Sequence, residues 1–251
     1  MKVVLLTQNS DVGRVTANYL AEHFDDFVTI FEEPVSQSAL VRSRIKRLGT
    51  AVVAGQLAFL AFQRLQRQFS KRRITEIKQT FAFDNSQMQC PIECAPSVNS
   101  DICRELLREL APKVVLVMGT RIIGSETLKA VGAPFINYHA GITPKYRGVH
   151  GAYWARVSGD AEHCGISVHL IDAGIDTGPV LYHARIVPTA EDNFSTYPYL
   201  QLAAGLPLLS RAAKDALSGT LRPREVNLPS RLWSHPTFWS YCANGLRCGI
   251  W

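Results

Sequence analysis

Three polar residues of different chemical types, Asn137, His139 and Asp176, follow or flank apolar runs in the middle of the sequence. An asparagine amide can donate hydrogen bonds, a histidine ring can titrate near neutral pH, and an aspartate can orient and charge-balance that ring. Active sites of α/β proteins are commonly built from such side chains where strands end and loops begin. We therefore predict that these three residues are catalytic, although a turn asparagine and an internally hydrogen-bonded histidine would also fit the pattern.

The strands that would position these residues are predicted at 134–138 and 164–171, separated by a loop rich in glycine and proline and one short helix. Residues 2–7 and 114–118 are continuously apolar, as central strands are when helices cover both faces of a parallel sheet. Further strands are predicted at 27–31 and 180–187, helices at 12–20, 102–110, 125–131, 151–157 and 196–217, and a loop over 81–98. These elements predict an α/β fold with a mostly parallel central sheet and helices on both faces.

The order and spacing of the polar residues resemble the folate-dependent formyltransferase family. This family includes glycinamide ribonucleotide formyltransferase, methionyl-tRNA formyltransferase and the sugar N-formyltransferases. The matching segments are, in order, Asn137–His139, Pro144–Gly148, Trp154, Gly165–His169 and Asp176–Pro179. The resemblance covers residues 100–190 well and implies the family's Rossmann-like fold.

The resemblance also implies the chemistry, which is transfer of a formyl group from 10-formyltetrahydrofolate to a primary amine. Asn137 and His139 would hydrogen-bond the formyl oxygen as negative charge develops on it. Asp176 would fix the tautomer of His139 and carry the proton of the amine to the departing folate nitrogen. His169 also matches a motif position, but a purely structural role fits it equally well.

Other residues are implied as ligand contacts by their positions in the family's pattern. Arg121 and Ile123 match residues that contact the folate, and the turn Ala173, Gly174 and Ile175 matches a segment whose backbone binds the pterin. Lys145, Tyr146, Arg147 and Trp154 are predicted to bind the acceptor. The two cations could steer an anionic substrate and the aromatic rings could stack on a nucleotide base, although solvated cations would also fit.

The acceptor that we predict is an amino sugar on a nucleotide carrier, with glycinamide ribonucleotide or another small amine as the alternative. Residues 7–11 occupy the place where glycinamide ribonucleotide formyltransferases carry a glycine-rich phosphate loop, but glycine first appears at Gly13. After Gly219 the chain has 32 residues, too few for the C-terminal barrel with which methionyl-tRNA formyltransferases bind tRNA. We therefore expect no tRNA substrate.

Length and composition favour one globular unit, because 251 residues with 47% hydrophobic content suffice for a buried core. We predict a catalytic domain over residues 1–219 and an aromatic C-terminal tail over 220–251. The six cysteines show no paired C-x-x-C spacing and no complete set of metal ligands. Free thiols in a reducing cytoplasm, with no bound metal, are therefore expected.

The net charge of +6 is concentrated in one segment, because ten basic residues and one acidic residue lie between Arg42 and Lys78. That segment carries +9, and the rest of the chain therefore carries −3. We predict a basic amphipathic helical insertion over about 38–75, too short and too interrupted to span a bilayer. It could pack on the domain or on a second copy in a homodimer, or bind an anionic membrane surface through residues 40–75. A non-catalytic protein that binds a membrane or nucleic acid is the alternative from another functional class.

Overall fold

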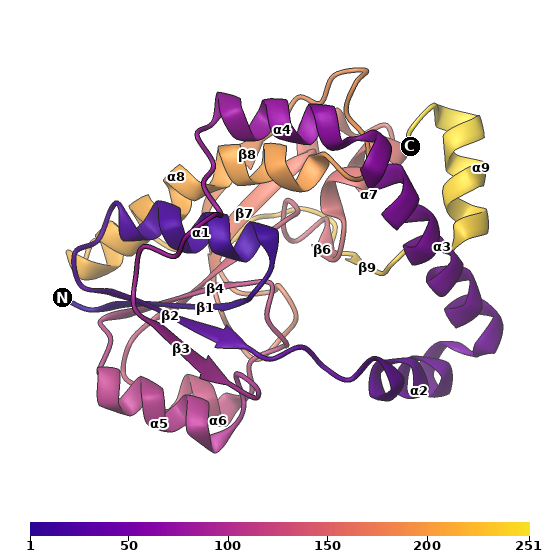
Figure 1. The fold of residues 1–251 in the computed structure, drawn as a ribbon. Helices are drawn as coiled ribbons and strands as arrows, with labels where there is room; N and C mark the ends of the chain where they lie inside the picture. Colours follow the sequence, from indigo (N-terminus) through magenta and orange to yellow (C-terminus); the bar gives the residue numbers. More distant parts are fainter.

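The computed structural model describes the backbone of residues 1–251 and every side chain except those of Gln37 and Ala39. Within this described chain, seven strands form the central sheet in the order β3-β2-β1-β4-β5-β7-β8 (Figure 1). They are β1 (Val3–Gln8), β2 (Phe27–Glu32), β3 (Ile92–Ala95), β4 (Val114–Met118), β5 (Phe135–His139), β7 (Gly165–Leu170) and β8 (Val180–Arg185). The strands from β3 to β5 pair in parallel, whereas β7 runs antiparallel to both β5 and β8. The predicted mostly parallel sheet is confirmed.

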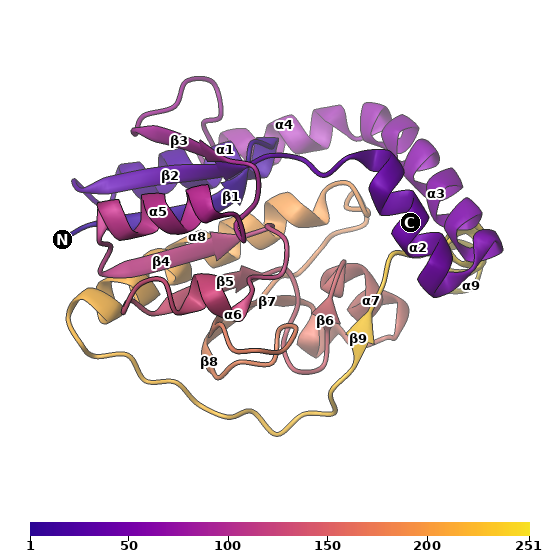
Figure 2. The same cartoon turned by 90° about the horizontal axis from the view of Figure 1, so that it is seen from below.

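Helices cover both faces of the sheet because successive side chains of a strand point to opposite sides. Val3 and Leu5 of β1 lie in one core with the apolar faces of α1 and α8, whereas Val4 and Leu6 lie in a second core with α5. All four side chains are fully buried. The helices on the first face are α1 (Asp11–Ala21) and α8 (Tyr197–Leu217), and those on the second are α5 (Asp101–Leu110) and α6 (Ser125–Leu128) (Figures 1 and 2).

The short edge strand β3 corrects the sequence prediction, which placed a loop over residues 81–98. It pairs only with β2, and its residues Ile92, Glu93 and Cys94 are exposed. Because an exposed edge strand needs no apolar periodicity, its sequence gave no signal for a strand.

The predicted basic insertion forms three consecutive helices, α2 (Gln37–Leu48), α3 (Thr50–Phe69) and α4 (Lys71–Thr80). Gly49 separates α2 from α3 with a φ of 84°, a conformation that side chains disfavour. The α2 helix lies away from the sheet and contacts α3, whereas α4 packs beside α8 (Figure 1). None of the helices in the described chain has the length and apolar character needed to cross a membrane.

The C-terminal tail runs back across the molecule and ends beside the insertion (Figure 2). Its strand β9 (Leu232–Trp233) pairs with β6 (Arg147–Gly148), and its helix α9 (Phe238–Cys248) lies beside α3. A cluster of aromatic rings joins Phe59 of α3 and Tyr241 of α9 to Tyr153 of α7 (Gly151–Val157). The tail therefore packs on the insertion and on the loop region that follows β5.

Candidate active site

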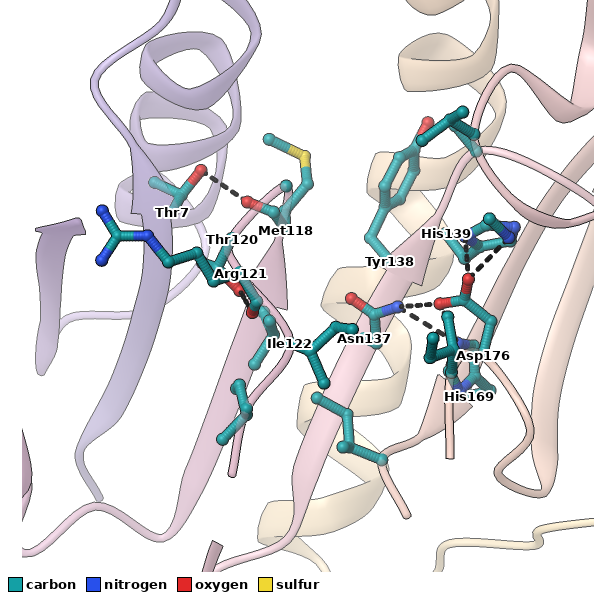
Figure 3. A pocket seen from close by; sticks show the side chains of 18 of the residues that line it. Thr7, Met118, Thr120, Arg121, Ile122, Asn137, Tyr138, His139, His169 and Asp176 are labelled. Carbon is teal, nitrogen blue, oxygen red and sulfur yellow. Dashed lines mark hydrogen bonds and ion pairs between the residues drawn. The ribbon is translucent and has the colours of Figure 1, made fainter. Parts of the chain in front are cut away.

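A cavity of about 580 Å³ lies where β1, β4 and β5 end at their carboxyl edge (Figure 3). Ligand sites of open α/β sheets occur at this edge, because the loops after parallel strands converge there. Apolar side chains such as Val117, Ile123 and Leu202 form much of its wall, and polar residues from several strand ends and loops complete it. Its size and lining are typical of a site for a small organic molecule.

The three residues predicted to be catalytic meet in the wall of this cavity (Figure 3). Asn137 and His139 are two positions apart on β5, so both side chains point to the same face of the sheet. The Nδ2 atom of Asn137 lies 3.4 Å from Oδ1 of Asp176, and Nδ1 of His139 lies 3.4 Å from Oδ2. One carboxylate therefore contacts both other residues.

The carboxylate of Asp176 is held in the loop between β7 and β8. Its backbone has a φ of 51°, in the left-handed region that aspartate tolerates better than most residues, and its Oδ2 accepts a hydrogen bond of 2.8 Å from the amide of Gly148. Burial by itself would raise the pKa of Asp176, but its polar contacts, among them the hydrogen bond from the Gly148 amide, outweigh it and lower the pKa to about 2. Asp176 is therefore ionised at neutral pH.

The ring of His139 is buried and has a defined tautomer. Its Nε2 lies 2.7 Å from the carbonyl oxygen of Tyr146, and because a carbonyl can only accept, Nε2 carries the proton. Nδ1 is then the nitrogen that can bind a further proton, beside Asp176. Burial lowers the pKa of His139 while the negative charge of Asp176 opposes that effect, so the resting ring is neutral.

His169 belongs to the same cluster. Its Nδ1 donates to the carbonyl of Leu170 at 2.8 Å, which leaves Nε2 to accept from Nδ2 of Asn137 at 3.1 Å. His169 faces Asn137 directly across the antiparallel pair β5–β7. The sequence left its role open, and the structure shows that it orients the amide of Asn137.

Most of the residues predicted to contact folate border the cavity. Arg121 turns its guanidinium away, donating to the carbonyls of Pro96 and Glu33 at 2.9 and 2.6 Å. Ile123, Gly174 and Ile175 also line the cavity, whereas Ala173 does not.

The four residues predicted to bind the acceptor lie outside the lining of the cavity. Tyr146 is buried and its hydroxyl donates to Asp160, so the prediction that it stacks on a nucleotide base is wrong. Lys145 forms an ion pair of 2.6 Å with the same carboxylate. Trp154 stacks on Trp233 of the tail, with ring centres 4.8 Å apart.

The fourth of these residues, Arg147, lies at the rim of the cavity. Its Nη1 donates to the carbonyl of Ile175 at 3.2 Å. All four residues therefore have contacts within the protein, which hold together the site loop, the loop before β8 and the tail.

His150 lines the cavity but was missed in the sequence. It begins α7 with a left-handed φ of 61°, and its Nε2 lies 2.9 Å from Nδ1 of His235 in the tail. Burial is the main cause that lowers the pKa of His150 to about 3 and that of His235 to about 4, so both rings are neutral. The two residues are far apart in the sequence, and no local pattern indicates their contact.

The start of α1, beside the cavity, presents a carboxylate instead of a glycine-rich loop. Ser10 caps the helix by accepting from the amide of Gly13 at 3.1 Å. The next residue, Asp11, forms a 2.7 Å ion pair with Lys78 of α4 and hydrogen bonds with Asn85 and Tyr199. Burial alone would raise the pKa of Asp11, but Lys78, Tyr199 and Arg67 outweigh it and lower the pKa, so a negative charge already lies where the helix dipole would attract an anion.

Comparison with known proteins shows a match to the family model described as formyl transferase over residues 35–200. The chain is 30% identical over 140 residues to methionyl-tRNA formyltransferase of Thermodesulfovibrio yellowstonii, covering 55% of this chain and 45% of that protein. It is 36% identical over 121 residues to the Myxococcus xanthus enzyme of the same name, covering 47% and 38%. The chain thus matches less than half the length of these relatives.

Solved structures share the fold at low sequence identity. A sugar N-formyltransferase from a Shewanella species aligns with a TM-score of 0.57 at 15% identity, covering 93% of this chain and 76% of that one. Phosphoribosylglycinamide formyltransferase from Anaplasma phagocytophilum aligns with a TM-score of 0.57 at 15% identity, covering 92% and 95%. An N-formyltransferase from Helicobacter canadensis, solved with folinic acid and dTDP-3-aminofucose, gives 0.55 at 15%, covering 93% and 71%.

Proposed function

Because the chain belongs to the formyl transferase family, we propose that it transfers a formyl group from 10-formyltetrahydrofolate to a primary amine of a small acceptor. The match over residues 35–200 confirms the family predicted from the sequence and supports the predicted class of enzyme. The observation that carries the proposed reaction is that Asn137, His139 and Asp176 meet at one wall of the cavity. The carboxylate of Asp176 lies 3.4 Å from Nδ2 of Asn137 and 3.4 Å from Nδ1 of His139.

In the proposed reaction the acceptor nitrogen forms a bond to the formyl carbon, and negative charge develops on the formyl oxygen. The Nδ2 group of Asn137 has two N–H donors. One is held by His169 at 3.1 Å, and the other, whose contact with Asp176 is long at 3.4 Å, can donate to that oxygen instead. A donor fixed in advance in this way stabilises the developing charge without a reorganisation cost.

The proton of the attacking amine must reach the folate nitrogen as the bond between that nitrogen and the formyl carbon breaks. Asp176 is ionised, and Nδ1 of His139 beside it has a free lone pair. The pair can therefore take the proton from the amine and return it to the leaving nitrogen. A proton on Nδ1 would also let His139 donate to the formyl oxygen, and Asp176 would balance the charge of the ring.

For the acceptor, we propose an amino sugar on a nucleotide carrier. The structural similarity to sugar N-formyltransferases supports this choice, including one solved with dTDP-3-aminofucose. The carboxylate of Asp11 at the start of α1 disfavours a phosphate group at that position, which speaks against glycinamide ribonucleotide as the acceptor.

Initiator tRNA is the second candidate, because the sequence relatives named above are methionyl-tRNA formyltransferases. The short tail, from which we expected no tRNA, does not decide the matter, since the chain matches only part of those relatives.

The test is a turnover assay that follows the release of tetrahydrofolate from 10-formyltetrahydrofolate. Acceptors would be amino-sugar nucleotides, glycinamide ribonucleotide and methionyl initiator tRNA. We expect turnover with an amino-sugar nucleotide and its loss in His139→Ala. Turnover with tRNA alone would refute the proposed acceptor but not the reaction, and absence of both turnover and folate binding by calorimetry would refute the reaction.

A further inference from the structure

The outward surface of α2 and α3 is both apolar and basic, and the site described above does not use it. On α3 the exposed residues Ala54, Leu57, Ala61 and Leu65 recur at helical spacing and form one stripe. The opposite side of the helix buries Val53, Gln56 and Phe59 against the protein. The helix is therefore apolar on two sides, and only one of them is covered.

The uncovered side chains are large and well exposed. Leu57 is 43% exposed, Leu65 56% and Phe69, at the end of α3, 81%. Leu40 and Ile45 of α2 are exposed as well. Large apolar side chains gathered on one surface typically mark an interaction site.

The insertion that exposes these apolar side chains is also rich in basic residues. Arg67, Arg73 and Lys78 of the insertion form ion pairs with Asp11, Glu76 and Asp192. Among the described side chains, no carboxylate lies within ion-pair distance of the other seven basic residues of the insertion, which are Arg42, Arg44, Lys46, Arg47, Arg64, Lys71 and Arg72. Five of these seven cations, Arg42, Arg44, Lys46, Arg47 and Arg64, belong to α2 and α3, which therefore carry an unbalanced positive charge.

Charge and apolar character together identify the partner. A second copy of the chain would bring the same cations against this surface, and their repulsion disfavours a homodimer here. Nucleic acid would neutralise the cations but would leave Leu57, Leu65 and Phe69 without an apolar partner. An anionic bilayer satisfies both, because its headgroups attract cations while its acyl boundary accepts apolar side chains.

We infer that α2 and α3 bind the surface of an anionic lipid bilayer, with the outward side chains of Leu57, Leu65 and Phe69 inserted among the headgroups. The helices would lie in the plane of the membrane, since none is long and apolar enough to cross it within the described chain. The carboxyl ends of β1 and β2 point toward the side of the molecule that carries α2 (Figure 1), so the edge of the sheet with the cavity lies on that side.

The experiment is co-sedimentation of the full-length chain with vesicles of phosphatidylcholine alone or mixed with phosphatidylglycerol. The charge variant carries Arg42→Gln, Arg44→Gln, Lys46→Gln and Arg47→Gln. The apolar variant carries Leu57→Ser, Leu65→Ser and Phe69→Ser, all at exposed positions. The control carries four exposed changes that lower the net charge equally: Arg108→Gln, Lys113→Gln, Lys129→Gln and Arg222→Gln.

We expect the parent chain to bind the mixed vesicles and not those of phosphatidylcholine alone. The charge and apolar variants should each bind at least about tenfold more weakly, and the control should match the parent within about twofold. Vesicle binding is read without turnover, so the result is independent of the proposed reaction.

Three outcomes would overturn the inference. The first is no binding of the parent to mixed vesicles, and the second is equal weakening by the charge variant and the control. The third is that the parent and the apolar variant bind duplex DNA equally well and do not bind vesicles. That result would identify the surface as a nucleic-acid site. Circular dichroism and melting temperature of each variant establish that it is folded.

Discussion

The backbone amide of Gly148 donates a hydrogen bond of 2.8 Å to Oδ2 of Asp176. Gly148 belongs to β6, and β6 is paired with β9 of the C-terminal tail. Directly after β6, the amide of Val149 donates a hydrogen bond of 3.2 Å to the carbonyl of Trp233 in β9. The tail therefore fixes the segment around Gly148, and this segment fixes the carboxylate of Asp176. No residue of the tail itself lines the cavity.

We expect Gly148→Ala to lower kcat by about tenfold to a hundredfold, the effect of losing one hydrogen bond to a charged group. Gly148 has a φ of 92°, and a Cβ there would lie 2.2 Å from the carbonyl oxygen of Trp233. The added methyl group must push β6 and β9 apart and move the amide away from Asp176. Steady-state kinetics with the acceptor identified by the turnover assay would measure this, with less change in KM than in kcat.

Gly159→Ala is the matched control for this substitution. Gly159 has a φ of 68° and no atom near the position of a Cβ, so it has the same kind of backbone strain without the collision. We expect kcat of this variant to equal that of the parent. Equal kcat values in the two variants, both measured below their melting temperatures, would show that β9 does not position Asp176.

We expect Asn137→Ala to lower kcat by about 10²- to 10³-fold while leaving the melting temperature nearly unchanged. Its Nδ2 group is the amide donor that His169 orients toward the carboxylate, and its side chain is only partly buried. The control is Asn227→Ala, a change at an exposed position outside the cavity. Near-parental turnover in a stably folded Asn137→Ala would remove the amide from the mechanism.

The meeting of Asn137, His139 and Asp176 could be predicted because strand ends and loops at one edge of a sheet converge. Alternation places Asn137 and His139 on the same face of β5, and continuous apolar runs identify the buried strands β1 and β4. Helix α8 was predicted within one residue, because its apolar positions recur over its whole length. Each of these features is encoded by neighbouring residues.

The missed features depend on residues that are distant in sequence. The pair β6–β9 joins two-residue strands, which are too short to show any periodicity. Tyr146 has the type and position of a ligand contact, but Asp160 and the ring of Trp233 draw it into the interior. Long-range packing of this kind leaves no local pattern in the sequence.

The stability of the protein should reveal the lowered pKa of Asp176, about 2 in the folded chain against about 3.9 in an unfolded one. As the pH falls, the unfolded state takes up a proton on Asp176 before the folded state does. The stabilisation from this carboxylate is therefore present above about pH 4 and is lost as the pH falls toward about 2. Urea unfolding of parent and Asp176→Asn at pH 5 and pH 3 measures it. The difference in free energy of unfolding should shrink by about 1 kcal/mol at pH 3, and a constant difference would contradict the lowered pKa.

The pair His150 and His235 should make the free energy of unfolding depend on pH at about pH 6, and acid should again destabilise the protein. Both rings are neutral when folded, with pKa values of about 3 and about 4, whereas an unfolded histidine binds a proton near about pH 6.5. Stability is therefore complete above about pH 6.5 and falls as the pH drops toward 4, by up to about 2 kcal/mol per ring at pH 5. In His235→Asn the free energy of unfolding should fall less between pH 7 and pH 5 than in the parent. An equal fall in the two proteins would show that the contact between the tail and the cavity does not keep His235 neutral.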